Sequence, residues 1–349
     1  MKKTLKKELE EVVKEFDGVL ADNISYLIQS REGYYIVYLD IENDLDWFLT
    51  DEGEKQLDQE KYSPFLTCIE LEIPLCLTKI LTRIEKKYNI SLYRCAQANY
   101  KKFYIWSREF CNQADEEYIQ TATCFVLYCC LVDKILDSER FPLNYKYMVY
   151  KDMDKFIEMS EAVTCDLEEL YELRVKVQKF VRTKQKSDNT YALLQTKIDR
   201  AIKSEQFMAV HSVKDFDTKM EFEMVTDKSV EFVSAAFIIA AYDFAEKDVI
   251  IEASESRGWI FGYIDDICDY MSDMETGSLN SLLFICTDMQ SDMSIEERMK
   301  MAAVNVDRAI EKLELNVKKL GKLVGKQLYW FILDELWDWM ADVRRIMEG

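Results

Sequence analysis

Four aspartates lie close together in the segment GYIDDICDYMSDMETGSLNSLL, which spans residues 262–283. They are Asp265, Asp266, Asp269 and Asp273, and apolar residues stand between them. In an α-helix, positions four residues apart advance by only about 40° around the axis, so Asp265, Asp269 and Asp273 share one face. Like charges at this spacing repel each other unless a cation neutralises them. The segment therefore predicts an acidic helix face that binds a cation.

A second pair of carboxylates follows a long apolar run. Asp133 and Asp137 are four residues apart in LYCCLVDKILDSERF, and they come directly after ATCFVLYCCLV at 122–132. Carboxylate oxygens are hard ligands that suit Mg²⁺, an ion that keeps several waters and bridges to substrate phosphates. Two helices that each end a buried stretch with carboxylates therefore predict a magnesium site for a diphosphate substrate.

The composition indicates which elements position these carboxylates. The 349 residues include only 9 Gly and 3 Pro, and 49% of the residues are hydrophobic. Because Gly and Pro mark turns and interrupt helices, their scarcity predicts long, closely packed helices. We expect an all-α fold in which residues 63–349 form a single large helical bundle. Residues 1–62 differ in pattern and are expected to form an N-terminal extension.

Charge and histidine content argue against several classes of protein. The net charge is −20, with 45 Lys+Arg against 65 Asp+Glu, which argues against nucleic acid as a partner. With His211 as the one histidine, a Cys/His zinc site or a His-based triad is not expected. The candidate chemistry in this sequence is therefore that of the carboxylates and the cations near them.

Neither a signal peptide nor a membrane span is expected. The first residues, MKKTLKKELEEVVKEF, are charged throughout, and the ten cysteines include no CxxC pair. We therefore expect reduced thiols and a cytoplasmic location. The longest apolar runs, at 122–132 and 232–242, are shorter than the roughly 20 residues that a bilayer requires. We expect both runs to be buried helices.

The two acidic segments resemble the aspartate-rich motifs of class I isoprenoid synthases, the superfamily of prenyl diphosphate synthases and terpene cyclases. The first DDxxD motif of that superfamily corresponds to Asp133 through Asp137, with Lys134 in place of the second aspartate. The second DDxxD motif corresponds to residues 265–269. The resemblance extends in layout over residues 65–349.

The cyclase motif (N/D)DxxSxxxE matches the second segment as well. Its first, fifth and ninth positions, which carry the metal ligands, correspond to Asp265, Asp269 and Asp273. The resemblance implies an all-α class I terpenoid synthase fold and a cluster of three Mg²⁺ ions. The metal ligands that it implies are Asp133, Asp137, Asp265, Asp266, Asp269 and Asp273. All of these except Asp266 are also the implied catalytic residues.

Cations near the motifs are candidates for binding the substrate diphosphate. Lys228 and Ser229 resemble the lysine–hydroxyl pair that precedes a buried helix in prenyl synthases. The other candidate cations are Lys219, Arg140, Arg344 and Arg345.

Within the superfamily, the sequence favours a cyclase. A chain-elongating synthase carries RRG after the first motif and a basic GK element upstream, and this chain has neither. The resemblance then implies a terpene cyclase that ionises one linear prenyl diphosphate (C15 or C20) and cyclises or rearranges the carbocation. Three alternatives stay open: a trans-prenyl elongase, a head-to-head squalene/phytoene-type synthase, and a non-catalytic helical regulatory subunit. Since many members are dimers, a homodimer is also compatible with the resemblance.

Overall fold

The computed structural model describes residues 71–111, 114–154, 156, 167–184, 189–212, 222–242, 246–285 and parts of 308–324. The regular elements within these ranges are helices, and no β-strand occurs there. The all-α prediction is confirmed for this part of the chain. The expected extension at 1–62 and the start of the expected bundle at residue 63 lie outside the described residues.

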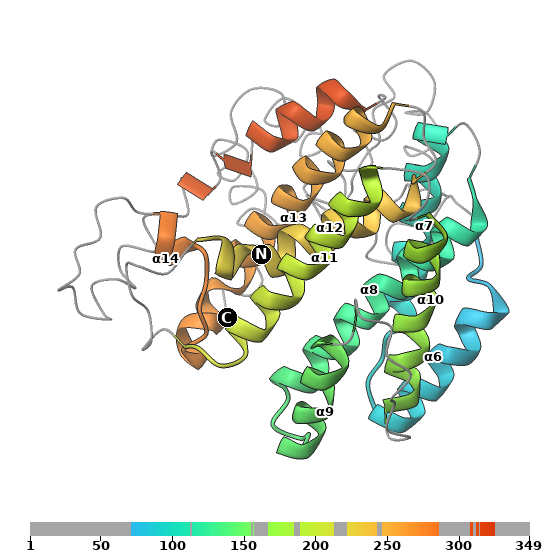
Figure 1. The fold of residues 1–349 in the computed structure, drawn as a ribbon. Helices are drawn as coiled ribbons and strands as arrows, with labels where there is room; N and C mark the ends of the chain where they lie inside the picture. The colour runs from blue at the N-terminus through green and yellow to red at the C-terminus, as the bar shows by residue number, and fades with distance from the viewer. Residues whose placement is uncertain are drawn as a thin grey trace, which may run out of the picture. The chain divides into compact units, whose positions relative to one another are not determined.

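Figure 1 labels the helices, and their numbering is kept below. Their bounds are α6 Leu75–Tyr88, α7 Tyr93–Cys111, α8 Glu116–Asp137, α9 Leu143–Asp154, α10 Glu168–Lys184, α11 Asn189–Met208, α12 Glu223–Ala240, α13 Lys247–Thr276 and α14 Leu282–Ile285.

The chain divides into two compact units. One unit comprises Leu71–His211 and Met220–Gly258, and it is called the α8 unit here. The other comprises Met1–Glu70, Ser212–Lys219 and Trp259–Gly349, and it is called the α14 unit. Each acidic segment belongs to one of these units, because Asp133 and Asp137 lie in the α8 unit and the aspartates of α13 lie in the α14 unit.

Helix α8 forms the core of the α8 unit. The side chain of Asp115 caps its first turn by accepting hydrogen bonds from the backbone N–H groups of Glu117 at 3.0 Å and Tyr118 at 3.4 Å. Helices α7, α10 and α12 pack around its middle turns (Figure 1), so the apolar run at 122–132 is buried on most sides. The sequence prediction of a buried helix at this position is confirmed.

By length and composition alone, α8 is also the one helix among the described residues that could cross a bilayer. Polar turns extend the apolar run at both ends and give a helix of 22 residues. However, 67% of its most apolar window is buried inside the fold. Packing against neighbouring helices therefore accounts for its apolar composition.

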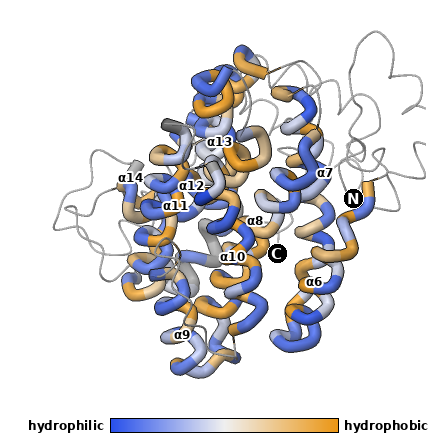
Figure 2. The backbone as a smooth tube through the Cα atoms, turned by 45° about the vertical axis from the view of Figure 1, so that its right-hand side comes forward, coloured by the Kyte–Doolittle hydropathy of each residue, from blue (hydrophilic) through white to orange (hydrophobic). Residues whose placement is uncertain are grey.

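The outer helices of the α8 unit are amphipathic, as Figure 2 shows by the alternation of hydrophilic and hydrophobic residues along α6. The buried residues of α6 recur every three or four positions, which is the period of one helix face. They are Leu77, Ile80, Leu81, Ile84 and Tyr88.

Candidate functional site

The last turns of α8 present the first acidic pair. Asp133 is half-buried, Asp137 is exposed, and both belong to the final two turns of the helix. Lys134, which replaces the second aspartate of the motif, is exposed beside them. The helix ends at Asp137, and Lys146 Nζ then donates a hydrogen bond to the carbonyl of Leu136. A lysine at this place also complements the negative end of the helix dipole.

Lys228 of α12 lies between two carboxylates from different helices. Its Nζ is 3.9 Å from Asp133 Oδ1 and 3.9 Å from Glu205 Oε2 of α11. Both separations exceed the length of a direct hydrogen bond, which is about 2.7–3.2 Å, so these contacts are charge pairings rather than hydrogen bonds. The structure thus brings together the first acidic motif and the lysine that the sequence assigned to diphosphate binding.

Glu205 is a member of this cluster that sequence reasoning missed. Its side chain is only 6% exposed. The pKa of Glu205 is raised to about 7, chiefly by burial, with Lys228 opposing the shift and the charges of Asp133 and Asp137 adding to it. The sequence pattern that could have identified Glu205 is a carboxylate on an apolar helix face. Glu205 follows Ile198, Ala201 and Ile202 at helical spacing, and all three of these residues are buried.

Asp137 carries the same kind of perturbation. Although the residue is exposed, withdrawal of its carboxyl group from water is the largest cause that raises its pKa to about 6. The neighbouring charge of Asp133 raises the pKa as well, while Lys228 and Lys134 lower it. Burial and the neighbouring carboxylate together therefore outweigh the effect of the two lysines on the pKa of Asp137.

Ser204 fixes the backbone of α12 at Lys228. The Ser204 hydroxyl accepts a hydrogen bond from the backbone N–H of Lys228 at 2.9 Å and donates one to the carbonyl of Met224 at 3.0 Å. These two backbone groups are four residues apart on α12, so one hydroxyl on α11 contacts both. The position of Lys228 along α12 is thereby tied to α11.

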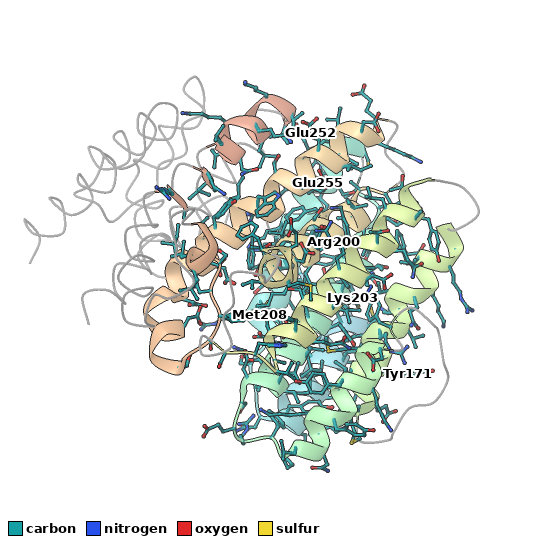
Figure 3. All side chains as sticks on the ribbon, turned by 60° about the vertical axis from the view of Figure 1, so that its left-hand side comes forward. Tyr171, Arg200, Lys203, Met208, Glu252 and Glu255 are labelled. Atoms are coloured by element: carbon teal, nitrogen blue, oxygen red, sulfur yellow. The ribbon has the colours of Figure 1, made fainter. Side chains whose placement is uncertain are left out.

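Ion pairs fix the register of α11 against α12 (Figure 3 labels Arg200 and Glu255). Arg200 donates to both carboxylate oxygens of Asp227, at 2.8 and 3.0 Å. Lys197 Nζ donates to Glu231 at 2.7 Å and pairs with Glu255 of α13 at 3.2 Å. Asp227 and Glu231 flank Lys228 in the sequence, so these pairs hold the turn that carries the lysine.

Helix α13 approaches α12 closely at Gly258. A Cβ atom added there would lie 2.3 Å from the carbonyl oxygen of Val230, which is shorter than any real contact. Glycine therefore permits this approach, and Val230 is two residues after Lys228.

Of the other predicted cations, Arg140 is the one that lies in the described part of the chain. Arg140 donates to the carbonyl of Asn89 at 3.3 Å and to that of Tyr88, and its guanidinium lies 5.0 Å from the ring centre of Phe141. It thus binds the carbonyl groups that end α6. Lys219, Arg344 and Arg345 lie outside the described residues.

The aspartates of α13 form a separate local network within the α14 unit. Gly277 adopts a left-handed conformation with φ of 77°, and the chain folds back so that Asn280 donates to the Asp273 carboxylate at 2.8 Å. Asn280 also donates to the carbonyl of Asp266 at 2.9 Å, and Ser281 Oγ donates to the Asp266 carboxylate. Sequence reasoning missed both partners, for which the turn signal at Gly277 is the clue.

The remaining two predicted ligands of α13 differ in exposure. Asp265 is half-buried and Asp269 is exposed. The predicted convergence of the two acidic segments concerns residues of different units and stays a prediction.

The donor set at the end of α8 fits a hard divalent cation. Asp133 and Asp137 offer carboxylate oxygens one helical turn apart. Burial, and after it the charge of Asp133, raises the pKa of Asp137, and a bound cation would offset the second of these causes. Among the described side chains, no three His, Cys, Asp or Glu already converge into a complete metal site. An ion at this place would therefore complete its coordination with waters and substrate oxygens.

Comparison with known proteins gives a distant structural similarity. No family model matches the chain, and no curated protein matches it. A polyprenyl synthase from Caulobacter crescentus CB15, solved in complex with calcium and isoprenyl diphosphate, matches with 11% identity and a TM-score of 0.43. The match covers 79% of this chain and 92% of that chain. A similarity at this level does not by itself assign a family or a substrate.

Proposed function

We propose that the protein is a Mg²⁺-dependent class I terpene synthase that ionises a linear prenyl diphosphate. The observation that carries this proposal is the pairing of Lys228 Nζ with Asp133 Oδ1 at 3.9 Å. It joins a carboxylate suited to a metal with a cation suited to a phosphate oxygen, and the two come from helices far apart in the sequence. Sites for metal-bridged diphosphates commonly combine both kinds of group.

Asp133 and Asp137 would hold Mg²⁺ in the α8 unit, and Asp265, Asp269 and Asp273 are the second predicted set of ligands. Bound Mg²⁺ would supply Lewis-acid neutralisation of the charge that develops on the departing diphosphate. Lys228 would bind a diphosphate oxygen and add positive charge where negative charge develops. Ser204 and Glu205 would orient Lys228 for that role.

Helices α8 and α12, which carry Asp133 and Lys228, also carry aromatic side chains within two turns of these charged residues. Phe232 is one helical turn after Lys228 on α12, and its ring packs edge-on against Phe125 of α8 with a centroid separation of 5.7 Å. Phe125 is two helical turns before Asp133. A charged head beside aromatic walls matches a prenyl diphosphate, and ring faces can stabilise a carbocation. These walls would also exclude water from the cation.

The direct test is incubation with farnesyl or geranylgeranyl diphosphate and Mg²⁺, each with and without isopentenyl diphosphate. We expect release of pyrophosphate without isopentenyl diphosphate, together with cyclic or rearranged hydrocarbons or alcohols in the extract by gas chromatography. Longer prenyl diphosphates that appear only with isopentenyl diphosphate would identify an elongase instead. Retention of the diphosphate on both substrates would contradict the proposal and favour a non-catalytic subunit.

Matched variants separate the site from general effects of charge. Asp133→Ala should abolish release of pyrophosphate, and so should Asp265→Ala if the second acidic segment also binds metal. Glu139→Gln removes a negative charge from an exposed residue two positions after Asp137, and this control should retain activity. Equal loss in Glu139→Gln would mean that net charge, rather than the site, governs turnover.

A further inference from the structure

Two cysteines face each other where α7 packs against α8. Cys95 Sγ of α7 lies 3.8 Å from Cys130 Sγ of α8, and both residues are half-buried rather than enclosed. A disulfide bond is about 2 Å long, so the two sulfur atoms have to approach each other further for the bond to form. The pair is independent of the proposed diphosphate chemistry.

The surroundings of the pair make its two thiols unequal. Asn99 Nδ2 donates a hydrogen bond to Cys95 Sγ at 3.3 Å. The hydrogen bond from Cys130 is the largest cause that lowers the pKa of Cys95 to about 7, with Lys102, Asn99 and Lys134 contributing and burial opposing. The same hydrogen bond raises the pKa of Cys130 well above its usual value, and burial adds to that increase. Cys95 is thus the thiol of the pair that ionises more readily, and Cys130 is the one that keeps its proton longer.

Cys124 and Cys76 of the α8 unit have different surroundings. Cys124 is fully buried, and burial raises its pKa to about 12. Cys76 is exposed, and its Sγ lies 3.5 Å from an oxygen of Gln120 rather than from a second sulfur. Thiolate character together with access determines which thiol reacts with oxidants. Cys95 combines both with a resolving thiol in contact.

We propose that Cys95 and Cys130 form a thiol modification site that reacts with hydrogen peroxide and closes into a disulfide between α7 and α8. The Cys95 thiolate attacks one peroxide oxygen, the O–O bond breaks, and the departing hydroxide takes a proton to become water. Cys95 is then a sulfenic acid. Cys130 loses its proton and attacks the Cys95 sulfur, and the displaced hydroxide leaves as a second water with that proton. Two thiols are oxidised and one peroxide is reduced to two waters.

The test uses the full-length protein, reduced and then exposed to a small excess of hydrogen peroxide. Remaining thiols are alkylated, and peptides are mapped by mass spectrometry without reduction. We expect a Cys95–Cys130 disulfide peptide to accumulate while Cys76 is still alkylated. Alkylation of Cys95 in the reduced protein should rise with pH around a midpoint near 7. Cys95 and Cys130 remaining as thiols while Cys76 is oxidised would overturn the proposal, and so would a disulfide to a different cysteine.

Two variants assign the steps. In Cys130→Ser, we expect Cys95 to stop at a sulfenic acid that dimedone traps, because no resolving thiol is present. In Cys95→Ser, Cys130 should stay a thiol. Cys76→Ser is the matched control and should form the disulfide at the rate of the unmodified protein. Circular dichroism verifies that each variant is folded, and trapping on Cys130 in the Cys95→Ser variant would contradict the assigned order.

Discussion

At the scale of single residues, Lys228 is the group on which the proposed chemistry depends most. It is the cation that links α8 and α11 through pairings of 3.9 Å with Asp133 and Glu205. Lys228→Met keeps the length of the side chain and removes its charge. We expect kcat to fall by about 10²-fold or more, the loss seen when one preorganised group that stabilises developing negative charge is removed. Steady-state kinetics with farnesyl and geranylgeranyl diphosphates measure this loss.

The control for Lys228 is Lys203→Met, which removes an exposed lysine from α11 (labelled in Figure 3). Its kcat should stay close to that of the unmodified protein. If Lys228→Met changes KM alone and leaves kcat intact, the lysine binds the ground state and does not assist departure of the diphosphate.

Glu205 gives a residue-scale prediction about stability and pH. Its carboxyl group faces Lys228 of α12, Asp133 and Asp137 of α8 and Tyr150 of α9. Because its pKa is raised to about 7 in the folded protein, its contribution to stability is present below the unfolded pKa of about 4.3 and is lost as pH rises through 7. Glu205→Gln should therefore gain stability relative to the unmodified protein as pH rises from 5 to 8.

The expected gain is on the order of 3 kcal/mol, because one pKa unit corresponds to about 1.4 kcal/mol. Urea unfolding at several pH values in EDTA measures it without interference from divalent ions. A difference between the two proteins that does not change with pH would show that Glu205 titrates normally.

At the scale of elements, the contact between α12 and α13 at Gly258 leaves no room for a larger residue. A Cβ atom there would meet the Val230 carbonyl oxygen at 2.3 Å, and this neighbour is backbone that cannot rotate away. Gly258→Ala should therefore push the helices apart and destabilise the fold by roughly 1–3 kcal/mol, the usual cost of overpacking. Since Val230 lies within one helical turn of Lys228, this displacement should also move the lysine, and activity should fall.

Gly277→Ala is the comparison for Gly258→Ala. Gly277 has a positive φ of 77° and no atom near its added Cβ, so its cost is backbone strain of about 1 kcal/mol without a steric clash. Thermal unfolding of both variants distinguishes the two causes. A stable, fully active Gly258→Ala protein would mean that α12 and α13 do not approach as closely as described.

At the scale of the whole molecule, metal and diphosphate should bind together rather than singly. Asp133 and Asp137 at the end of α8 are neighbouring carboxylates, and burial together with the charge of Asp133 raises the pKa of Asp137. Among the described side chains, no three His, Cys, Asp or Glu form a complete metal site. Mg²⁺ alone therefore has too few ligands, and pyrophosphate alone meets the carboxylates as like charges. We expect Mg²⁺ with pyrophosphate to raise Tm by several degrees, and either one alone to have little effect.

The Asp133→Ala variant controls for nonspecific stabilisation by salt. Its Tm should not change when Mg²⁺ and pyrophosphate are added together. Calorimetry of pyrophosphate binding with and without Mg²⁺ gives a second readout. Tight binding of Mg²⁺ in the absence of pyrophosphate would contradict the incomplete site.

The sequence by itself determined the helical class of the described chain and much of its local chemistry. Helical period and the scarcity of Gly and Pro are properties of neighbouring residues, so the buried helix around 122–132 and the shared face of Asp133 and Asp137 were predictable. Lys228 was singled out by a resemblance to a lysine–hydroxyl pair that precedes a buried helix, and the structure places it within α12 instead.

Only the tertiary structure decided which helix faces meet, because packing joins residues that are distant in the chain. It placed Glu205 beside Lys228, directed Arg140 to the end of α6, and put Cys95 against Cys130. No local pattern encodes these pairings, since each depends on the rotation and register of two helices at once. Burial then gave Glu205 and Asp137 pKa values that their residue types alone do not have, because desolvation arises only once surrounding helices exclude water.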